Sequence, residues 1–264
     1  MISIWQVLVQ FAFRLSFGVA LSMGLTPPKL VTSGFYRVHL WVLMGINTVA
    51  ALAVWTDRDA FAAAKTPWVM VMSLAIGIAV ASYAGAVCWL YENAKAGGLA
   101  LFIVALGSLM ASAFATPWTS ATGPGGVILA FLELISSGML LGATMSAMLL
   151  GHWYLNTPTM ALAPLKRLVQ MMIGAVAIRT VLCAIGLAVH LSGDSPIQAH
   201  FGTLLAFRWL AGLLGVSMMG MLAWHTLKVP NTQSATGILY AGVILAFIGE
   251  LVSQLLLVDR LYPL

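Results

Sequence analysis

The sequence alternates between long apolar stretches and short polar connections, and this pattern predicts a set of membrane-spanning helices. Each apolar stretch holds about twenty residues, which as a helix crosses a hydrocarbon core of about 30 Å. The expected spans are 2–25, 36–55, 68–91, 97–115, 126–152, 166–191, 201–226 and 234–258. We therefore predict an all-α fold, a polytopic integral membrane protein with about eight transmembrane helices arranged as four hairpins.

The connections between these stretches carry residues that stop helices. Pro27 and Pro28 follow the first stretch, and Gly97 and Gly98 separate the third from the fourth. Every connection is shorter than about fifteen residues, which leaves no room for a soluble domain between two spans. We expect residues 1–264 to form one transmembrane domain.

Composition supports a lipid environment and argues against a soluble one. Apolar residues make up 61% of the chain and charged residues 7%, whereas soluble domains carry about 25% charged residues. The lipid bilayer is thus the first predicted partner. The net charge of +5 would suit a nucleic acid, but the twelve Lys and Arg are scattered singly over helix ends, so we predict no nucleic-acid partner.

The distribution of Lys and Arg predicts an orientation. The connections after the odd-numbered spans hold Lys29, Arg37, Lys95, Lys166, Arg167 and Lys228, and the other side holds Arg58, Lys65 and Arg260. Cytoplasmic loops are enriched in Lys and Arg. We therefore expect a bacterial inner (cytoplasmic) membrane with both termini outside.

Five charged residues interrupt the apolar stretches and give the first candidate site. The fifth and sixth spans carry Glu133 and Arg179, and the seventh and eighth repeat the plan with the signs exchanged, as Arg208 and Glu250. Arg14 lies in the first span. At about 1.5 Å per residue, Arg14 and Arg179 lie near mid-membrane, and the other three lie in the outer half. We take all five as candidate catalytic residues.

The cost of burial predicts how these charges pair. An ionised side chain at membrane depth costs at least about 2.5–3.5 kcal/mol, so such groups face protein or water and find partners. Matching depths predict the pair Arg208–Glu250. Glu133 is paired with Arg179 across a small difference in depth that a long arginine side chain and helix tilt can bridge, and Arg14 is left without a partner. A purely structural network has no use for such an arginine, which favours an anionic ligand: a carboxylate, a phosphate, a haem propionate or a semiquinone oxygen. The alternative is that the charges only fix how the hairpins dock.

Three histidines form the second candidate site. His39, His152 and His225 are expected at the cytoplasmic ends of the second, fifth and seventh spans, and we consider them as cofactor-binding residues for a quinone or a single b-type haem. Histidines at a membrane interface also bond helix ends or lipid head groups. No clustered spacing indicates a metal site.

These features favour three functions in turn. The first is a membrane subunit of a quinone-linked or b-haem electron-transfer complex, with other membrane or peripheral subunits as partners. The second is a proton-coupled transporter or channel that uses Glu133 and Glu250 as carriers, because buried ionisable pairs mark ion routes. The third is a non-catalytic scaffold or assembly protein. No nucleophile–base pair or phosphate-binding loop is apparent, so the sequence leaves open whether the chain is an enzyme.

Overall fold

The computed structural model describes residues 3–116, 123–157, 159–192, 199–229 and 231–257, and every element within them is a helix. The helices are α1 (Ile4–Gly24), α2 (Ser33–Thr56), α3 (Arg58–Ala63), α4 (Trp68–Leu90), α5 (Ala94–Ala115), α6 (Gly123–Asn156), α7 (Ala163–Leu191), α8 (Ala199–Phe207), the π-helix η2 (Arg208–Gly215), α9 (Val216–Thr226) and α10 (Thr232–Leu256). Within the described residues, eight helices are long and apolar enough to cross a membrane. The prediction of an all-α, eight-span membrane protein is confirmed.

Two elements were not expected from the sequence. The short helix α3 lies in the connection between the second and third spans, and the seventh span is a composite of α8, η2 and α9. The first arises because residues 58–63 are mostly alanine between polar residues, which favours a helix too short to span. No sequence signal that we used distinguishes a π-helix from an α-helix.

Local sequence explains several helix starts. Ser3 and Gln6 form a reciprocal capping box at the start of α1, with the Gln6 amide donating to Ser3 Oγ at 3.2 Å and the Ser3 amide donating to Gln6 Oε1 at 2.9 Å. Asn93 and Asn231 cap α5 and α10 through their side-chain oxygens. Pro164 lies in the first turn of α7, where its missing amide hydrogen leaves no intrahelical bond unmade.

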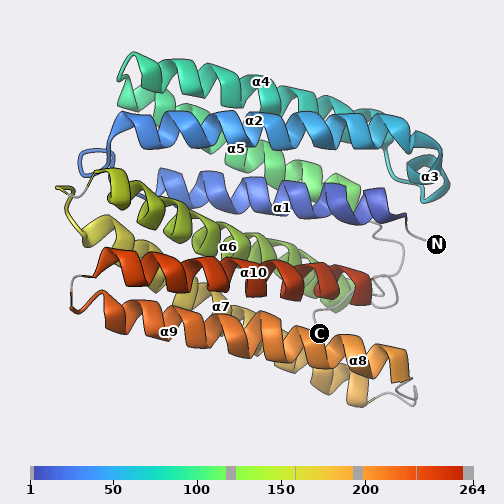
Figure 1. The fold of residues 1–264 in the computed structure, drawn as a ribbon. Helices are drawn as coiled ribbons and strands as arrows, with labels where there is room; N and C mark the ends of the chain where they lie inside the picture. The colour runs from blue at the N-terminus through green and yellow to red at the C-terminus, as the bar shows by residue number, and fades with distance from the viewer. Residues whose placement is uncertain (1–2, 117–122, 158, 193–198, 230, 258–264) are drawn as a thin grey trace.

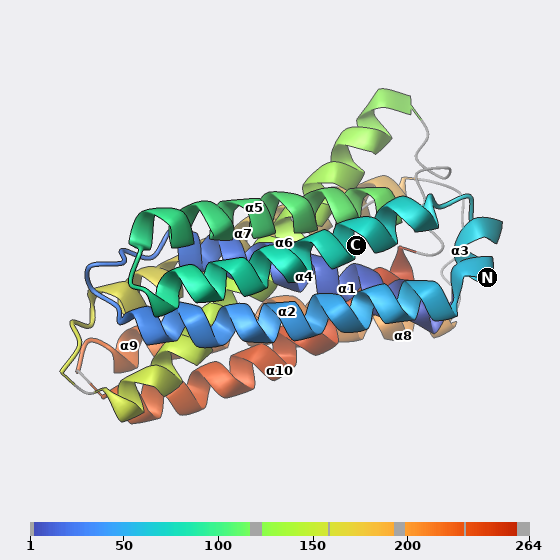
Figure 2. The same ribbon diagram turned by 90° about the horizontal axis from the view of Figure 1, so that it is seen from above.

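Successive spans run antiparallel, as the predicted hairpins require (Figure 1). We call the side of the bundle that holds Ile4 and Leu256 the terminal face, and the side that holds Gly24 and Thr232 the opposite face. The N-terminal spans α1, α2, α4 and α5 pack together, and so do the C-terminal spans α6, α7, α8 to α9 and α10. Helix α1 joins the two groups because it packs against α5 and α2 on one side and α6 and α10 on the other. Seen from above, α6 begins outside the bundle and crosses it obliquely (Figure 2).

Glycines allow two pairs of helix backbones to touch. A Cβ atom added to Gly18 of α1 would lie 1.7 Å from the Gly138 carbonyl oxygen of α6, and one added to Gly142 would lie 1.8 Å from the Gly18 carbonyl carbon. On the other side of the bundle, a Cβ at Gly249 of α10 would lie 2.1 Å from Gly212 Cα of η2. Small residues at such crossings are how helices approach closely in lipid, where no hydrophobic force draws them together.

Candidate functional site

Five charged side chains meet inside the bundle, and we call them the ion cluster: Arg14 of α1, Glu133 of α6, Arg179 of α7, Arg208 of η2 and Glu250 of α10. Each is between 0% and 1% exposed. Removing such charges from water is costly unless each one is paired and hydrogen-bonded. The packing of five helices is therefore tied to the geometry of this one cluster.

Arg179 lies at the centre of the ion cluster and binds both glutamates. Its Nε and Nη2 donate to Oε1 and Oε2 of Glu250 at 3.1 and 3.0 Å. Its Nη2 also donates to Glu133 Oε1 at 2.6 Å, and its Nη1 donates to Glu133 Oε2. A planar guanidinium offers five donors in a fixed fork, which suits two carboxylates better than an ammonium would. The predicted pair Glu133–Arg179 is confirmed, and Arg179 additionally links the two hairpins.

Arg208 and Arg14 occupy the two ends of the cluster. Arg208 Nη1 donates to Glu250 Oε1 at 2.8 Å, which confirms the predicted pair. Arg14 Nη1 donates to Glu133 Oε1 at 3.2 Å, and its Nη2 donates to Gln10 Oε1 at 3.4 Å. The prediction that Arg14 lacks a partner is therefore wrong.

The error came from assigning one arginine to each glutamate. A carboxylate has about four acceptor positions and serves more than one cation, so Glu133 accepts from Arg14 and Arg179 together. The expectation of an anionic ligand rested on an unpaired Arg14 and loses its basis. The charges instead form one chain of alternating sign, in the order Arg14, Glu133, Arg179, Glu250, Arg208.

Hydroxyl groups fill the remaining hydrogen-bond positions. Ser137 Oγ donates to Glu250 Oε2 at 2.5 Å, and Ser136 Oγ accepts from Arg179 Nη1 at 3.1 Å. Ser253 Oγ accepts from Arg179 Nη2 at 3.2 Å and lies 3.5 Å from Glu133 Oε1. Ser253 was not identified from the sequence, although its spacing of three residues from Glu250 puts both on one helix face.

A repeated motif also went unnoticed in the sequence. Phe13-Arg14 is followed by Gly18, and Phe207-Arg208 is followed by Gly212. The two arginines at the ends of the ion cluster therefore each precede a glycine by four residues. In each case that glycine makes the close backbone crossing, with α6 or with α10. The arginine and the glycine lie one turn apart on one face, so the crossing brings each arginine to a glutamate on the neighbouring helix.

The π-helix begins at Arg208, the last arginine of the cluster. Arg208, Gly212 and Leu213 are its buried residues. A Cβ at Gly212 would lie 2.8 Å from Arg208 Nη1, so the guanidinium occupies space that only glycine leaves. Long π-helices are rare, and single π turns occur frequently at functional sites. Arg208 Nη2 also donates to Cys183 Sγ at 3.4 Å, a contact that the sequence did not indicate.

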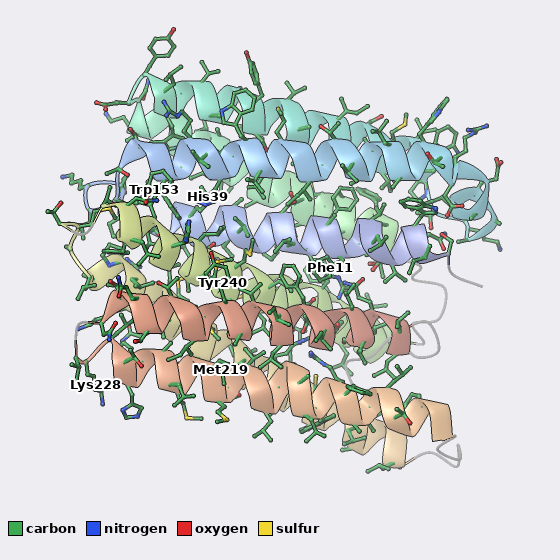
Figure 3. The ribbon with its side chains drawn as sticks, in the orientation of Figure 1. Phe11, His39, Trp153, Met219, Lys228 and Tyr240 are labelled. Atoms are coloured by element: carbon green, nitrogen blue, oxygen red, sulfur yellow. The ribbon has the colours of Figure 1, made fainter. Side chains whose placement is uncertain are left out.

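The three candidate histidines lie apart from the ion cluster; His39 and His152 are near enough to interact electrostatically, but no hydrogen bond or ring contact joins any two of the three. His39 is 5% exposed, its Nδ1 is 2.6 Å from the Phe35 carbonyl oxygen, and its ring lies 6.2 Å from that of Trp153 (Figure 3). His152 is exposed, with Nδ1 3.3 Å from the hydroxyl of Tyr240. His225 is exposed at the end of α9, which packs against α7, η2 and α10 rather than against α2.

The space around His39 is too small for either expected cofactor. The cavity that His39 lines with residues of α1, α2 and α6 measures about 10 Å³, which is near the volume that one water needs. A haem or a quinone ring does not fit there, and neither His152 nor His225 lines that cavity. Among the described residues no group of three or more His, Cys, Asp or Glu could hold a metal ion.

Comparison with known proteins adds no relative. No protein-family model matches the sequence, and no curated protein or solved structure matches the chain.

Proposed function

We propose that this protein is a proton-coupled membrane transporter in which Glu133 and Glu250 carry the protons. The observation that carries the proposal is the single alternating chain of five charges, each at most 1% exposed, that joins five helices inside an apolar bundle. Intramembrane ionisable residues are costly to retain and mark ion routes and proton relays. A chain shared by five helices also gives protonation a means of changing how helices pack.

The proposed cycle uses Arg179 as the element shared by two carboxylates. With both glutamates ionised, Arg179 is held from both sides, and Arg14 and Arg208 close the two ends. A proton on Glu133 removes one charge, which weakens its hold on Arg14 and Arg179 while Glu250 stays bound. A proton on Glu250 does the converse, releasing Arg208 and η2. Each event biases one group of helices, as a two-state transporter requires.

The composite seventh span supports this function over a purely structural one. Transporters place their sites at interrupted helices, where irregular backbone lines the site. The seventh span changes from α-helix to π-helix at Arg208, inside the ion cluster. The interruption is present as a π-helix, which needs no proline.

Proton uptake into proteoliposomes tests the proposal. Purified protein is reconstituted with a pH-sensitive dye inside, and a potassium gradient with valinomycin imposes a membrane potential. We expect potential-driven proton uptake by the wild-type protein, and at least a tenfold loss in Glu133→Gln and in Glu250→Gln, because neither amide binds a proton.

Glu92→Gln serves as the matched control, since Glu92 is exposed in the connection after α4, and it is expected to retain wild-type uptake. Uptake by the wild type that equals that of empty liposomes contradicts the proposal. So does full uptake by both glutamine variants. Loss of monodisperse protein in both variants, with no flux in the wild type, favours the scaffold interpretation.

Quinone-linked electron transfer stays a prediction from the sequence. The cavity that His39 lines measures about 10 Å³, too small for a quinone ring, so it gives that function no support. An absorption spectrum and a lipid extract of the protein, purified in mild detergent, test for bound haem and quinone independently of the flux assay.

A further inference from the structure

The ion cluster has a buried polar neighbour with no hydrogen bonds of its own. Gln254 lies one turn beyond Glu250 on α10 and is 5% exposed. Within the described part of the chain neither its Oε1 nor its Nε2 has a hydrogen-bond partner, and Arg14 Nε also has none. Buried polar atoms are satisfied by protein or by ordered water. The Gln254 amide is thus free to bind a polar species beside the cluster.

Gln254 lies on the short side of the bundle, between the ion cluster and the terminal face. Glu250 is six residues from the end of α10 at Leu256, or about 9 Å at 1.5 Å per residue. It is eighteen residues, or about 27 Å, from the start at Thr232. Ser253, next to Gln254, already contacts Arg179 and Glu133. Gln254 is therefore one helical turn from one carboxylate, Glu250, and next in sequence to Ser253, which lies beside the other, Glu133.

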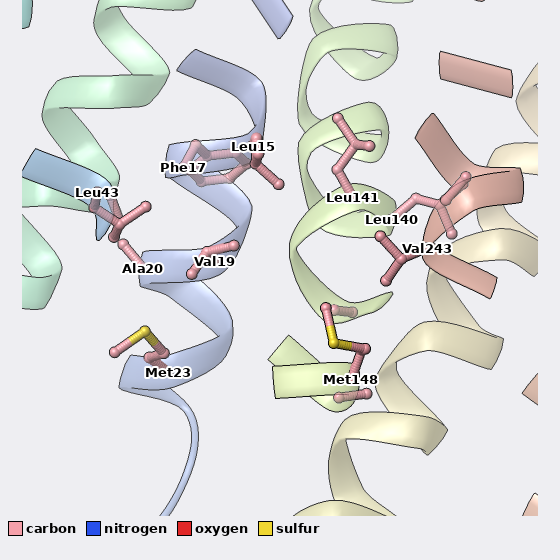
Figure 4. Packing of buried hydrophobic residues seen from close by; sticks show 14 of the residues in the cluster. Leu15, Phe17, Val19, Ala20, Met23, Leu43, Leu140, Leu141, Met148 and Val243 are labelled. Carbon is pink, nitrogen blue, oxygen red and sulfur yellow. The ribbon is translucent and has the colours of Figure 1, made fainter. Parts of the chain in front are cut away.

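The opposite side of the cluster is closed by apolar packing. One turn beyond Arg14, Gly18 brings the backbones of α1 and α6 into contact at Gly138 and Gly142. Farther along, Leu140, Leu141 and Met148 of α6 lie with Val243 of α10, and Val19, Ala20 and Met23 of α1 lie beside them, all 8% exposed or less (Figure 4). No water-sized space lies between backbones in contact, so this layer separates the cluster from the opposite face.

Two polar atoms within that layer do not extend the route. Asn47 Oδ1 and Ser146 Oγ lack partners. Asn47 donates instead to Ser16 Oγ at 3.0 Å, on the α2 side of α1. Ser146 is thirteen residues from Glu133 along α6, and Gly138 and Gly142, which touch α1, lie between them. Each is an isolated site rather than a continuation from the cluster.

We propose that water reaches Glu133 and Glu250 from the terminal face, along α10 past Gln254 and Ser253, and that this structure is closed toward the opposite face. Gln254 is then a positioning residue that orders water next to the carboxylates. This inference rests on the proposed function for its meaning, because it names the side from which the proton carriers are loaded. The route itself is tested without any measurement of transport.

Cysteine accessibility measures the route. In a chain with Cys88→Ser and Cys183→Ser, single Gln254→Cys and Ser253→Cys variants are reacted in sealed vesicles with a membrane-impermeant thiosulfonate, added to one side at a time. Ala62→Cys in the exposed helix α3 and Lys228→Cys after α9 identify the two faces. Ala246→Cys, a fully buried position eight residues before Gln254 on α10, is the matched control. Size-exclusion chromatography confirms that each variant is folded.

We expect Gln254→Cys and Ser253→Cys to react from the face that labels Ala62→Cys, at least tenfold faster than Ala246→Cys. No reaction of either variant from that face overturns the inference, as does faster reaction from the face that labels Lys228→Cys. Equal reaction of Ala246→Cys overturns the closed layer. Labelling with the expected sidedness in a protein that shows no proton uptake leaves the water route intact and removes the proposed transport.

Discussion

At the scale of single residues, the ion cluster depends most on Arg179. Arg179 binds both glutamates, whereas Arg14 binds Glu133 alone of the two. Removing one partner of a buried ion pair is strongly destabilising, because the other charge is left uncompensated. The stability lost when an arginine is replaced therefore depends on how many carboxylates lose an ionic partner.

We predict that Arg179→Met lowers the free energy of unfolding by about 3–5 kcal/mol, and that Arg14→Met costs less because Glu133 keeps its contacts with Arg179. Arg179→Lys should fall between wild type and Arg179→Met, since an ammonium keeps the charge but loses the fork. Unfolding in mixed micelles with increasing SDS measures these differences. The control is Arg167→Met, an exposed position on the same helix, where surface changes stay within about 0.5 kcal/mol. An equal loss in Arg14→Met and Arg179→Met would contradict the central place of Arg179.

The sequence predicted two of the ion pairs in the cluster but not the partner of Arg14. Burial cost and matched depth identify which charges must pair, so Glu133–Arg179 and Arg208–Glu250 were predictable. The partner of Arg14 was not, because the number of cations that one carboxylate accepts depends on the positions of its neighbours. His39, His152 and His225 share a predicted depth, yet depth says nothing about which helices are neighbours, and the structure places His225 on α9, which packs against α7, η2 and α10 rather than α2.

At the scale of elements, the helices were predictable and their contacts were not. A run of about twenty apolar residues has few alternatives to a spanning helix in lipid, where backbone groups must bond within the segment. The capping box at Ser3 and Gln6 and the asparagine caps follow local rules as well. The crossings at Gly18 and Gly212 are tertiary, and their only sequence signal, the repeated Arg-x-x-x-Gly spacing, went unnoticed.

We predict that Gly249→Ala separates η2 from α10, because the added Cβ would lie 2.1 Å from Gly212 Cα, a backbone atom that cannot turn aside. Overpacking of this kind lowers the free energy of unfolding by about 1–3 kcal/mol. Here it also lengthens the contact between Arg208 and Glu250, so proton uptake should fall together with stability. Gly237→Ala in the same helix has nothing within 4 Å of the new Cβ and should be neutral or stabilising. Unfolding in SDS and the proteoliposome assay report both effects. Tolerance of Gly249→Ala at wild-type stability would show that the two backbones do not touch.

At the scale of the whole molecule, the ion cluster connects two groups of four spans. The C-terminal group supplies four of the five charges, and α1 alone brings a charge from the N-terminal group. Spans α4 and α5 carry no member of the cluster. The contacts of α1 with α6 and α10, where Arg14 and Gly18 lie, form most of the boundary between the two groups, beside smaller contacts of α5 and of the α2 region with α6. This gives α1 a role in coupling that its position in the sequence does not suggest.

The orientation of the molecule decides which compartment loads the proposed carriers. Among the described residues, the helix ends and connections at the opposite face hold six Lys and Arg, against Arg58 and Lys65 at the terminal face, and positive residues stay on the cytoplasmic side. We therefore predict that an impermeant thiol reagent labels Ala62→Cys from outside intact cells, and labels Lys228→Cys only after the membrane is opened. The double substitution Arg58→Gln with Lys65→Gln removes positive charge from the terminal face. It should leave this labelling pattern unchanged, because it increases the excess of Lys and Arg on the opposite face. If Lys228→Cys is labelled from outside, the terminal face is cytoplasmic, and the water route past Gln254 would load Glu133 and Glu250 from the cytoplasm instead.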